Sequence, residues 1–193
     1  MSDCTVTHMS TTTLSTAEAR RPLVTAAALR TFAKGGFHGT TVADVAREAG
    51  ISPAYVFKLF PSKETLFASA LESCFAQVSK ALARGADASD DQSPTGILDA
   101  MGGAYAELLR DRALLMLQVH ALSVAEVEEI GAALRAGIAK VTMFAKDRSH
   151  APDADVQRFI AFGQLCHLIA TTHSDDETAE WARIVGSGIR HPS

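Results

Sequence analysis

Residues 40–64, TTVADVAREAGISPAYVFKLFPSKE, form the stretch of sequence that decides the fold. Its spacing predicts two short helices, over 41–49 and 53–60, on either side of a bend at Gly50, because glycine readily adopts the left-handed conformation that ends a helix. Ser52 suits the N-cap of the second helix, where its hydroxyl accepts a backbone N–H bond. Two helices joined in this way are the parts of a helix-turn-helix, although any tight corner between helices shares the spacing.

Apolar residues recur at helical spacing along the rest of the chain, without a convincing strand or internal repeat, so the predicted fold class is all-α. A helix from about Pro22 to Lys34 precedes the helix-turn-helix and ends at Gly35. Further helices are expected at 63–84, 94–110, 112–122, 124–147, 154–173 and 177–189.

Two of these helix starts are predicted from capping boxes, in which a Ser side chain and a Glu three residues later bond each other's backbone N–H groups. Ser123 and Glu126 form the first box, at the start of the helix over 124–147. Ser174 and Glu177 form the second box, at the start of the last helix.

Composition and charge divide the chain into a tail and two modules. Residues 1–15 are rich in Ser and Thr and are expected to be disordered. The predicted helix-turn-helix domain covers 16–84, including the start of a connecting helix, and a second helical domain covers 85–193. Residues 1–84 carry nine Lys and Arg against six Asp and Glu, whereas the remainder carries nine against sixteen, for a net charge of −4. This asymmetry is typical of a mildly basic module joined to an acidic one.

Catalytic and metal-binding classes are disfavoured by the motifs. The sequence has no nucleophile elbow, glycine-rich phosphate loop, HExxH or paired-carboxylate signature, so neither an enzyme nor a bound cofactor is expected. No metal site is expected, because ligand spacing is missing around the later histidines, His120, His167 and His173.

The sequence also favours a cytoplasmic protein. No uninterrupted apolar run approaches the roughly 18 residues that a membrane span needs, and the N-terminus lacks the basic start and apolar stretch of a signal peptide. Three cysteines without CxxC spacing are best read as reduced thiols, namely Cys4, Cys74 and Cys166.

The longer stretch AALRTFAKGGFHGTTVADVAREAGISPAYVFKLFPSKETLF resembles the N-terminal DNA-binding domain of TetR-family transcriptional regulators, over roughly residues 20–70. The matching elements occur in order: aromatic-Ala-x-x-Gly-Phe at 32–37, TTV-x-D-V-A at 40–46, Gly-Ile-Ser at 50–52 and F-P-S-K-E at 60–64. The resemblance implies a homodimeric repressor that places its second motif helix in the major groove of a double-stranded DNA operator and is released by a small-molecule effector. The alternative is a helical protein-interaction module without DNA binding, which the charge split and the F-P-S-K-E junction disfavour.

The resemblance also implies contacts with DNA phosphates. Thr41 and Ser52 match phosphate-contacting positions, and each also suits a helix N-cap. Lys63 matches the family's phosphate-binding lysine; a cation at a helix start is slightly disfavoured by the helix dipole, which makes its presence there a hint of function. Ala43 and Leu59 depart from the Arg and from the His or Tyr that are common at their positions.

The second motif helix supplies the expected base-reading residues. Pro53, Ala54 and Tyr55 match the family's reading positions. Phe57 stands where Tyr is usual, so it loses a phosphate hydrogen bond and can only pack against the sugar backbone. Lys58 is the one cation of this helix and can reach a phosphate or a guanine. Such a donor-poor face is expected to recognise DNA partly through shape and apolar contacts.

An effector pocket, also implied by the resemblance, is expected within 85–193, which is then the effector-binding and dimerisation domain. The candidate residues are mostly apolar with a few polar groups, as ligand pockets are, although each of them singly fits ordinary core packing. They are Met101, Tyr105, Leu109, Leu117, Gln118, His120, Phe144, Phe162 and Cys166. Such a lining predicts an apolar or aromatic effector.

The last two helices, about 154–173 and 177–189, are the expected dimer interface. The first of them is apolar on more than one face, which is typical of a helix that is buried on both sides. Trp181 and Ile184 belong to an apolar stripe on the second. A four-helix contact between two copies fits this pattern and the resemblance.

Overall fold

The computed structural model describes residues 16–189, so the predicted disordered tail at 1–15 and Cys4 lie outside the described residues. The described chain is helical and contains no β-strand, and the prediction of an all-α fold is confirmed. The helices are α1 (Thr16–Gly39), α2 (Val42–Ala49), α3 (Pro53–Leu59), α4 (Lys63–Asp87), α5 (Pro94–Leu108), α6 (Arg112–Leu122), α7 (Glu128–Ser149), α8 (Asp153–Thr172), the 3-10 helix η1 (Ser174–Asp176) and α9 (Glu180–Gly186).

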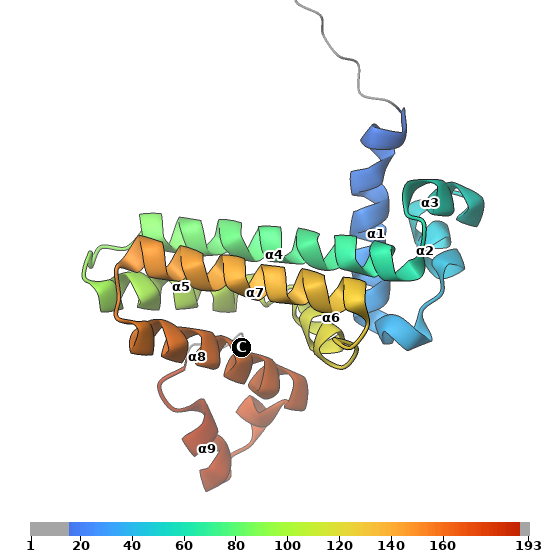
Figure 1. The fold of residues 1–193 in the computed structure, drawn as a ribbon. Helices are drawn as coiled ribbons and strands as arrows, with labels where there is room; N and C mark the ends of the chain where they lie inside the picture. The colour runs from blue at the N-terminus through green and yellow to red at the C-terminus, as the bar shows by residue number, and fades with distance from the viewer. Residues whose placement is uncertain (1–15, 190–193) are drawn as a thin grey trace, which may run out of the picture.

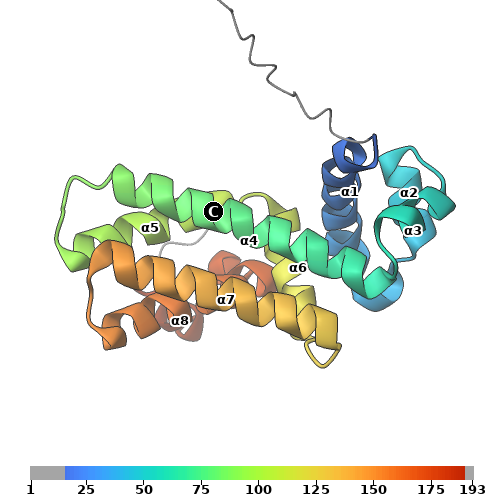
Figure 2. The ribbon, with the colours of Figure 1, turned by 45° about the horizontal axis from the view of Figure 1, so that its top comes forward.

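The helices form two groups that share α4 (Figure 1). In one group α4, α5 and α7 run side by side, and α8 packs against α5 and α7. In the other, α1 crosses α4, and α2 and α3 lie beyond it at one end of the molecule (Figure 2). With 25 residues, α4 spans roughly 37 Å at 1.5 Å per residue and belongs to both groups. The domain boundary near residue 85 stays a prediction, and it lies inside α4, which continues to Asp87.

A cluster of aromatic rings fixes the group that contains α1, α2 and α3. Phe32 of α1 lies edge-to-face on Phe67 of α4, with 4.8 Å between ring centroids, and Phe37 lies edge-to-face on the same ring at 5.7 Å. Edge-to-face pairs bring the positive rim of one ring onto the negative face of the other, which stabilises them beyond their buried area. Val45 and Val56 are fully buried in the same cluster, so α2 and α3 are held by their apolar faces.

The caps of the helix-turn-helix are those that the sequence predicts. Thr41 and Asp44 form the capping box of α2, and Gly50 ends that helix with φ of 65° in the left-handed region. The Ser52 hydroxyl accepts the Tyr55 N–H at 3.2 Å, which caps α3. These local bonds set the entry and exit of each short helix, while burial of one face supplies the stability.

The first helix is longer than predicted. It begins at Thr16, so Pro22 lies inside it rather than in its first turn. Pro22 is exposed to solvent, where water can bond the carbonyl group that loses its N–H partner. Near its end the helix is interrupted at Gly36, whose φ of 66° suits glycine, and it continues to Gly39.

Both predicted capping boxes in the second half of the chain are wrong. Ser123 adopts the helical conformation at the end of α6, and its hydroxyl donates to the His120 carbonyl, whereas an N-cap needs an extended backbone. Consequently α7 begins at Glu128. Ser174 is buried in η1, and the last helix covers Glu180–Gly186 instead of 177–189.

Candidate functional site

The exposed face of α3 is small and mostly apolar, as its sequence predicts. Pro53, Ala54, Phe57 and Lys58 are exposed, whereas Val56 is buried against the other helices of the motif. Phe57 is half exposed although it is fully apolar. An exposed aromatic ring beside a lysine on one short helix is suited to contact with the base edges and the sugars of DNA.

Tyr55 is less available than the sequence suggests. Its side chain is half-buried and packs against the apolar cluster of the helix-turn-helix. A base contact by Tyr55 is therefore restricted to the part of the ring that solvent reaches. Its placement as a reading residue stays a prediction.

The start of α2 carries a charge arrangement that the motif alone does not reveal. The Thr41 hydroxyl donates to Asp44 Oδ2 at 2.6 Å, and the Thr41 N–H donates to the same oxygen at 2.9 Å. These bonds, with that from Arg47, lower the pKa of Asp44 to about 2 and keep it ionised. Thr41 therefore acts as an N-cap, and a phosphate contact would require its hydroxyl to turn away from Asp44.

Arg47 is a candidate phosphate contact that sequence reasoning missed. Its guanidinium is paired with Asp44 one turn earlier on α2, and its side chain is 76% exposed. The spacing of three residues places both side chains on one helix face, which was the available signal. Arg47 offsets the charge of a carboxylate that would otherwise repel phosphate.

The other predicted phosphate contacts lie at the starts of α3 and α4. Ser52 is exposed, and its hydroxyl proton stays available because the oxygen acts as acceptor in the cap. Lys63 is half-buried, with Nζ 4.5 Å from the centroid of the Phe37 ring. This cation–π contact holds the lysine at the junction of α1 and α4.

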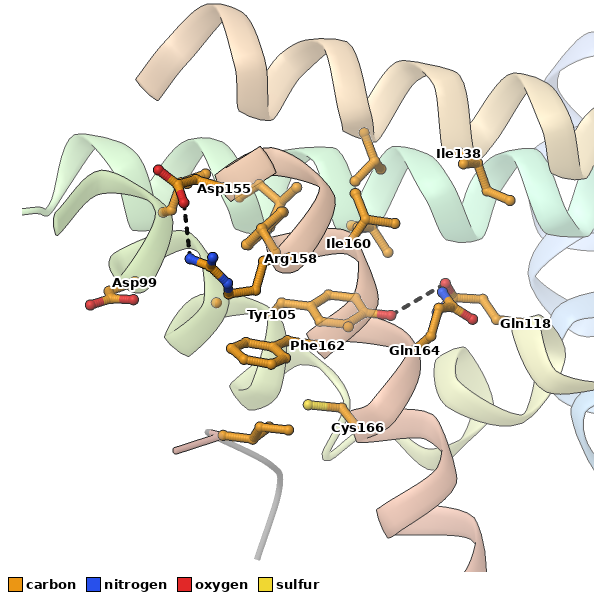
Figure 3. Close-up of a pocket in the computed structure, with 18 of the residues that line it drawn as sticks. Asp99, Tyr105, Gln118, Ile138, Asp155, Arg158, Ile160, Phe162, Gln164 and Cys166 are labelled. Atoms are coloured by element: carbon orange, nitrogen blue, oxygen red, sulfur yellow. Dashed lines mark hydrogen bonds and ion pairs between the residues drawn. The ribbon is translucent and has the colours of Figure 1, made fainter. Parts of the chain in front are cut away.

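The second feature is a cavity of about 390 Å³ between α4, α5, α7 and α8, a volume within the range of small-molecule sites. Its wall is mainly apolar and comes from these four helices, from Gln118 of α6 and from the end of the described chain. The lining residues are Phe75, Val78, Leu82, Thr95, Leu98, Asp99, Gly102, Tyr105, Gln118, Ile138, Val141, Asp155, Arg158, Phe159, Ile160, Phe162, Gly163, Gln164, Cys166, Gly188 and Ile189. Figure 3 shows Tyr105 crossing this space toward Gln118.

The predicted pocket residues are only partly brought together. Tyr105, Gln118, Phe162 and Cys166 line the cavity. The remaining candidates lie in the surrounding core or, for His120, near α1; they are Met101, Leu109, Leu117, His120 and Phe144. Sequence reasoning missed the whole contribution of α4 and the charged residues at the start of α8. The apolar stripe of α4 was the available signal for its part.

A buried polar network forms one wall of the cavity. The Tyr105 hydroxyl lies 2.7 Å from His167 Nε2 and donates to Gln118 Oε1 at 3.3 Å. Gln118 is oriented by its own Nε2, which donates to the Leu114 carbonyl at 3.1 Å. Burial lowers the pKa of His167 to about 4 and raises that of Tyr105, because charge is disfavoured away from water. All three groups are therefore uncharged near neutral pH.

A charged group lies at another edge of the cavity, formed by Asp99, Asp155 and Arg158. Arg158 Nη1 donates to Asp155 Oδ1 at 2.9 Å, and Figure 3 shows the two side chains turned toward each other. Asp99 is exposed and lies in the lining beside them. The guanidinium of Arg158 is thus paired with the Asp155 carboxylate.

Residues 24–70 match the family model described as "Bacterial regulatory proteins, tetR family". This segment is a TetR-family helix-turn-helix domain. The HTH-type transcriptional regulator RutR of Escherichia coli (strain K12) is 42% identical over 53 residues, which are 28% of this chain and 25% of RutR. The chain thus matches about a quarter of the length of its curated relatives.

Solved structures extend the likeness to the fold of the second domain. A TetR-family transcriptional regulator from Agrobacterium tumefaciens is 16% identical with a TM-score of 0.65, covering 89% of this chain and 94% of its own. The transcriptional regulator FadR from Bacillus subtilis, in complex with stearoyl-CoA, is also 16% identical with a TM-score of 0.61, covering 86% and 94%. At these identities the likeness concerns the fold alone: a TetR-family domain followed by a helical domain.

The surface of α8 and α9 carries exposed apolar side chains. They are Phe162, Leu168, Trp181 and Ile184. Large exposed apolar surfaces of this kind mark sites that another molecule covers. No helix within residues 16–189 is long and apolar enough to cross a bilayer, and no group of metal-ligating side chains gathers in that range.

Proposed function

We propose that the chain is a cytoplasmic transcriptional regulator that binds a specific DNA operator as a repressor and is released by a small apolar or aromatic effector. The observation that carries the proposal is the joining of a TetR-family domain, with an exposed α3 face, to a cavity of about 390 Å³. The function is one of binding rather than catalysis.

The active form in this proposal is a homodimer through α8 and α9. The exposed Leu168, Trp181 and Ile184 support this choice, because they give both helices an apolar face that lacks a partner within one described chain. A twofold dimer would present its two α3 helices to half-sites about 34 Å apart, or a multiple of that distance, along the DNA.

Helix α6 is the proposed connection between the cavity and the DNA-binding helices. Gln118 lines the cavity, whereas Leu117, one residue earlier, is buried in the cluster that contains α1. His120 packs against the kink of α1, since a Cβ at Gly36 would lie 3.1 Å from its Nδ1. A ligand that moves Gln118 therefore acts on the segment that leads into α2.

The proposal is tested by gel-shift titration of the purified chain with the DNA upstream of its own coding sequence, at stated salt. We expect specific binding whose log affinity falls linearly with log salt, by about 0.9 for each phosphate contacted. Random DNA of equal length is the control. Equal affinity for both DNAs would contradict an operator-specific regulator, and no binding to either DNA would favour the protein-interaction module.

Replacing Lys63 with alanine is expected to weaken binding to all sequences alike and to reduce the salt slope by about 1, because one phosphate contact is lost. Tyr55→Phe is the matched variant: it keeps the ring packing and removes the hydroxyl, so it should change discrimination between operator variants with an unchanged salt slope. Gel-shift at several salt concentrations measures both. An unchanged slope in Lys63→Ala would remove Lys63 from the phosphate contacts.

A further inference from the structure

We propose that the cavity selects an uncharged ligand with an apolar body and a single hydrogen-bonding head, such as a phenol or an alcohol, held by the Tyr105 hydroxyl and Gln118. The inference rests on the proposed function only in naming this ligand as the effector. The geometry of the cavity itself carries the choice of chemistry.

Each hydrogen bond of the buried polar network can be assigned its donor. The Tyr105 hydroxyl has one proton, and it is given to Gln118 Oε1. The shorter contact, 2.7 Å, is then made by the Nε2–H of a neutral His167, whose Nδ1 is buried without a partner among the described residues. His167, which does not itself line the cavity, therefore holds the Tyr105 hydroxyl in place through its Nε2–H.

The bond from Tyr105 to Gln118 is the replaceable member of this network. At 3.3 Å it is longer than the usual 2.5–3.0 Å of an O–H···O bond, and both residues line the cavity. A ligand hydroxyl that lies beside both atoms on the cavity side can accept from Tyr105 and donate to Gln118 Oε1. A head of this kind replaces one long bond with two shorter bonds.

The described lining of the cavity offers no unpaired cation to a negatively charged ligand head. Among the described residues that line the cavity, Arg158 is the one Lys or Arg, and it is paired with Asp155 beside Asp99. Burying a carboxylate against Tyr105 would remove its hydration without supplying a counter-charge, which is strongly unfavourable. The same argument disfavours an ammonium group at Gln118.

The body of the proposed ligand is apolar. Val78, Leu82, Leu98 and Phe159 belong to the apolar part of the lining that also contains Tyr105. Gly102 and Gly163 leave room there, because an added Cβ would have its nearest neighbours at 4.0 Å and 3.6 Å respectively. An alkyl or aryl group gains from burial against such a wall without a polar partner.

The test compares three compounds with the same body: butylbenzene, 4-butylphenol and 4-butylbenzoate, titrated into the purified full chain by calorimetry at pH 7.5 without DNA. We expect 4-butylphenol to bind about fivefold more tightly than butylbenzene and at least about tenfold more tightly than 4-butylbenzoate. Equal or tighter binding of 4-butylbenzoate would overturn the proposal, and this comparison needs no variant.

Tyr105→Phe is expected to lower the affinity for 4-butylphenol to that for butylbenzene, and to leave butylbenzene unchanged. Thr142→Val removes a hydroxyl from the exposed side of α7, outside the cavity lining, and should alter neither affinity. An equal loss for both compounds in Tyr105→Phe would contradict a hydrogen-bonding role for Tyr105. Because the titrations contain no DNA, failure of the ligand proposal leaves the gel-shift result standing, and the reverse also holds.

Discussion

Replacing His167 with glutamine is expected to remove about 3 kcal/mol of acid destabilisation between pH 6.5 and pH 4. In the native chain, burial lowers the pKa of His167 from its ordinary 6.5 to about 4. The unfolded chain therefore binds a proton in this window that the folded chain does not, so the free energy of unfolding falls as the pH falls. Glutamine keeps an N–H group that can reach Tyr105 but takes up no proton.

Urea unfolding at closely spaced pH values measures this difference. His38→Gln is the matched control, because it makes the same replacement at an exposed histidine outside the cavity. If the free energy of unfolding depended on pH equally in the native chain and in His167→Gln, His167 would not stay neutral in the folded state.

Replacing Gly137 with alanine is expected to lower the free energy of unfolding by about 1–3 kcal/mol and to abolish binding of 4-butylphenol. Gly137 lies on α7 directly against Phe75 of α4, and an added Cβ would overlap the Phe75 ring. Phe75 lines the cavity, so a shift of the ring that relieves the overlap changes the space that a ligand needs. Urea unfolding and calorimetry measure the two effects.

Gly102→Ala is the control that separates the loss of stability from the loss of ligand binding. Gly102 lies within α5, and a Cβ there meets only Phe159, at 4.0 Å. Alanine is favoured over glycine in a helix by about 1 kcal/mol, so this variant should be more stable while its cavity is smaller by one methyl group. If Gly137→Ala kept the stability and ligand affinity of Gly102→Ala, the α4–α7 contact would be looser than described.

Much of the helix-turn-helix could be predicted from sequence because its signals are local. Thr41, Ser52 and Gly50 each act within a few residues, and all of them perform the expected cap. The predicted Ser123 box is wrong because the backbone of Ser123 stays helical at the end of α6, where its hydroxyl donates to the His120 carbonyl. A serine between two helices can cap the start of the second or bond a carbonyl of the first, and tertiary packing decides which of the two it does.

The cavity was harder to predict, since periodicity identifies the apolar face of a helix but not what lies opposite it. Met101 and Tyr105 are four residues apart on α5 and share one apolar face, yet Met101 fills the core and Tyr105 lines the cavity. The difference depends on how α8 packs, which involves contacts between segments about 60 residues apart, such as Tyr105 with His167. No local signal in the sequence carries that information.

The exposed tryptophan of α9 gives the molecule a built-in optical reporter. Trp181 is the one tryptophan of the chain, and 54% of its surface is accessible in a single copy. Indole emission moves to shorter wavelength when water leaves the ring, so the intrinsic fluorescence of the unmodified protein follows whether α9 is covered. Dilution of the native chain then separates a paired from an unpaired α9 spectroscopically, without labels and independently of any DNA or ligand.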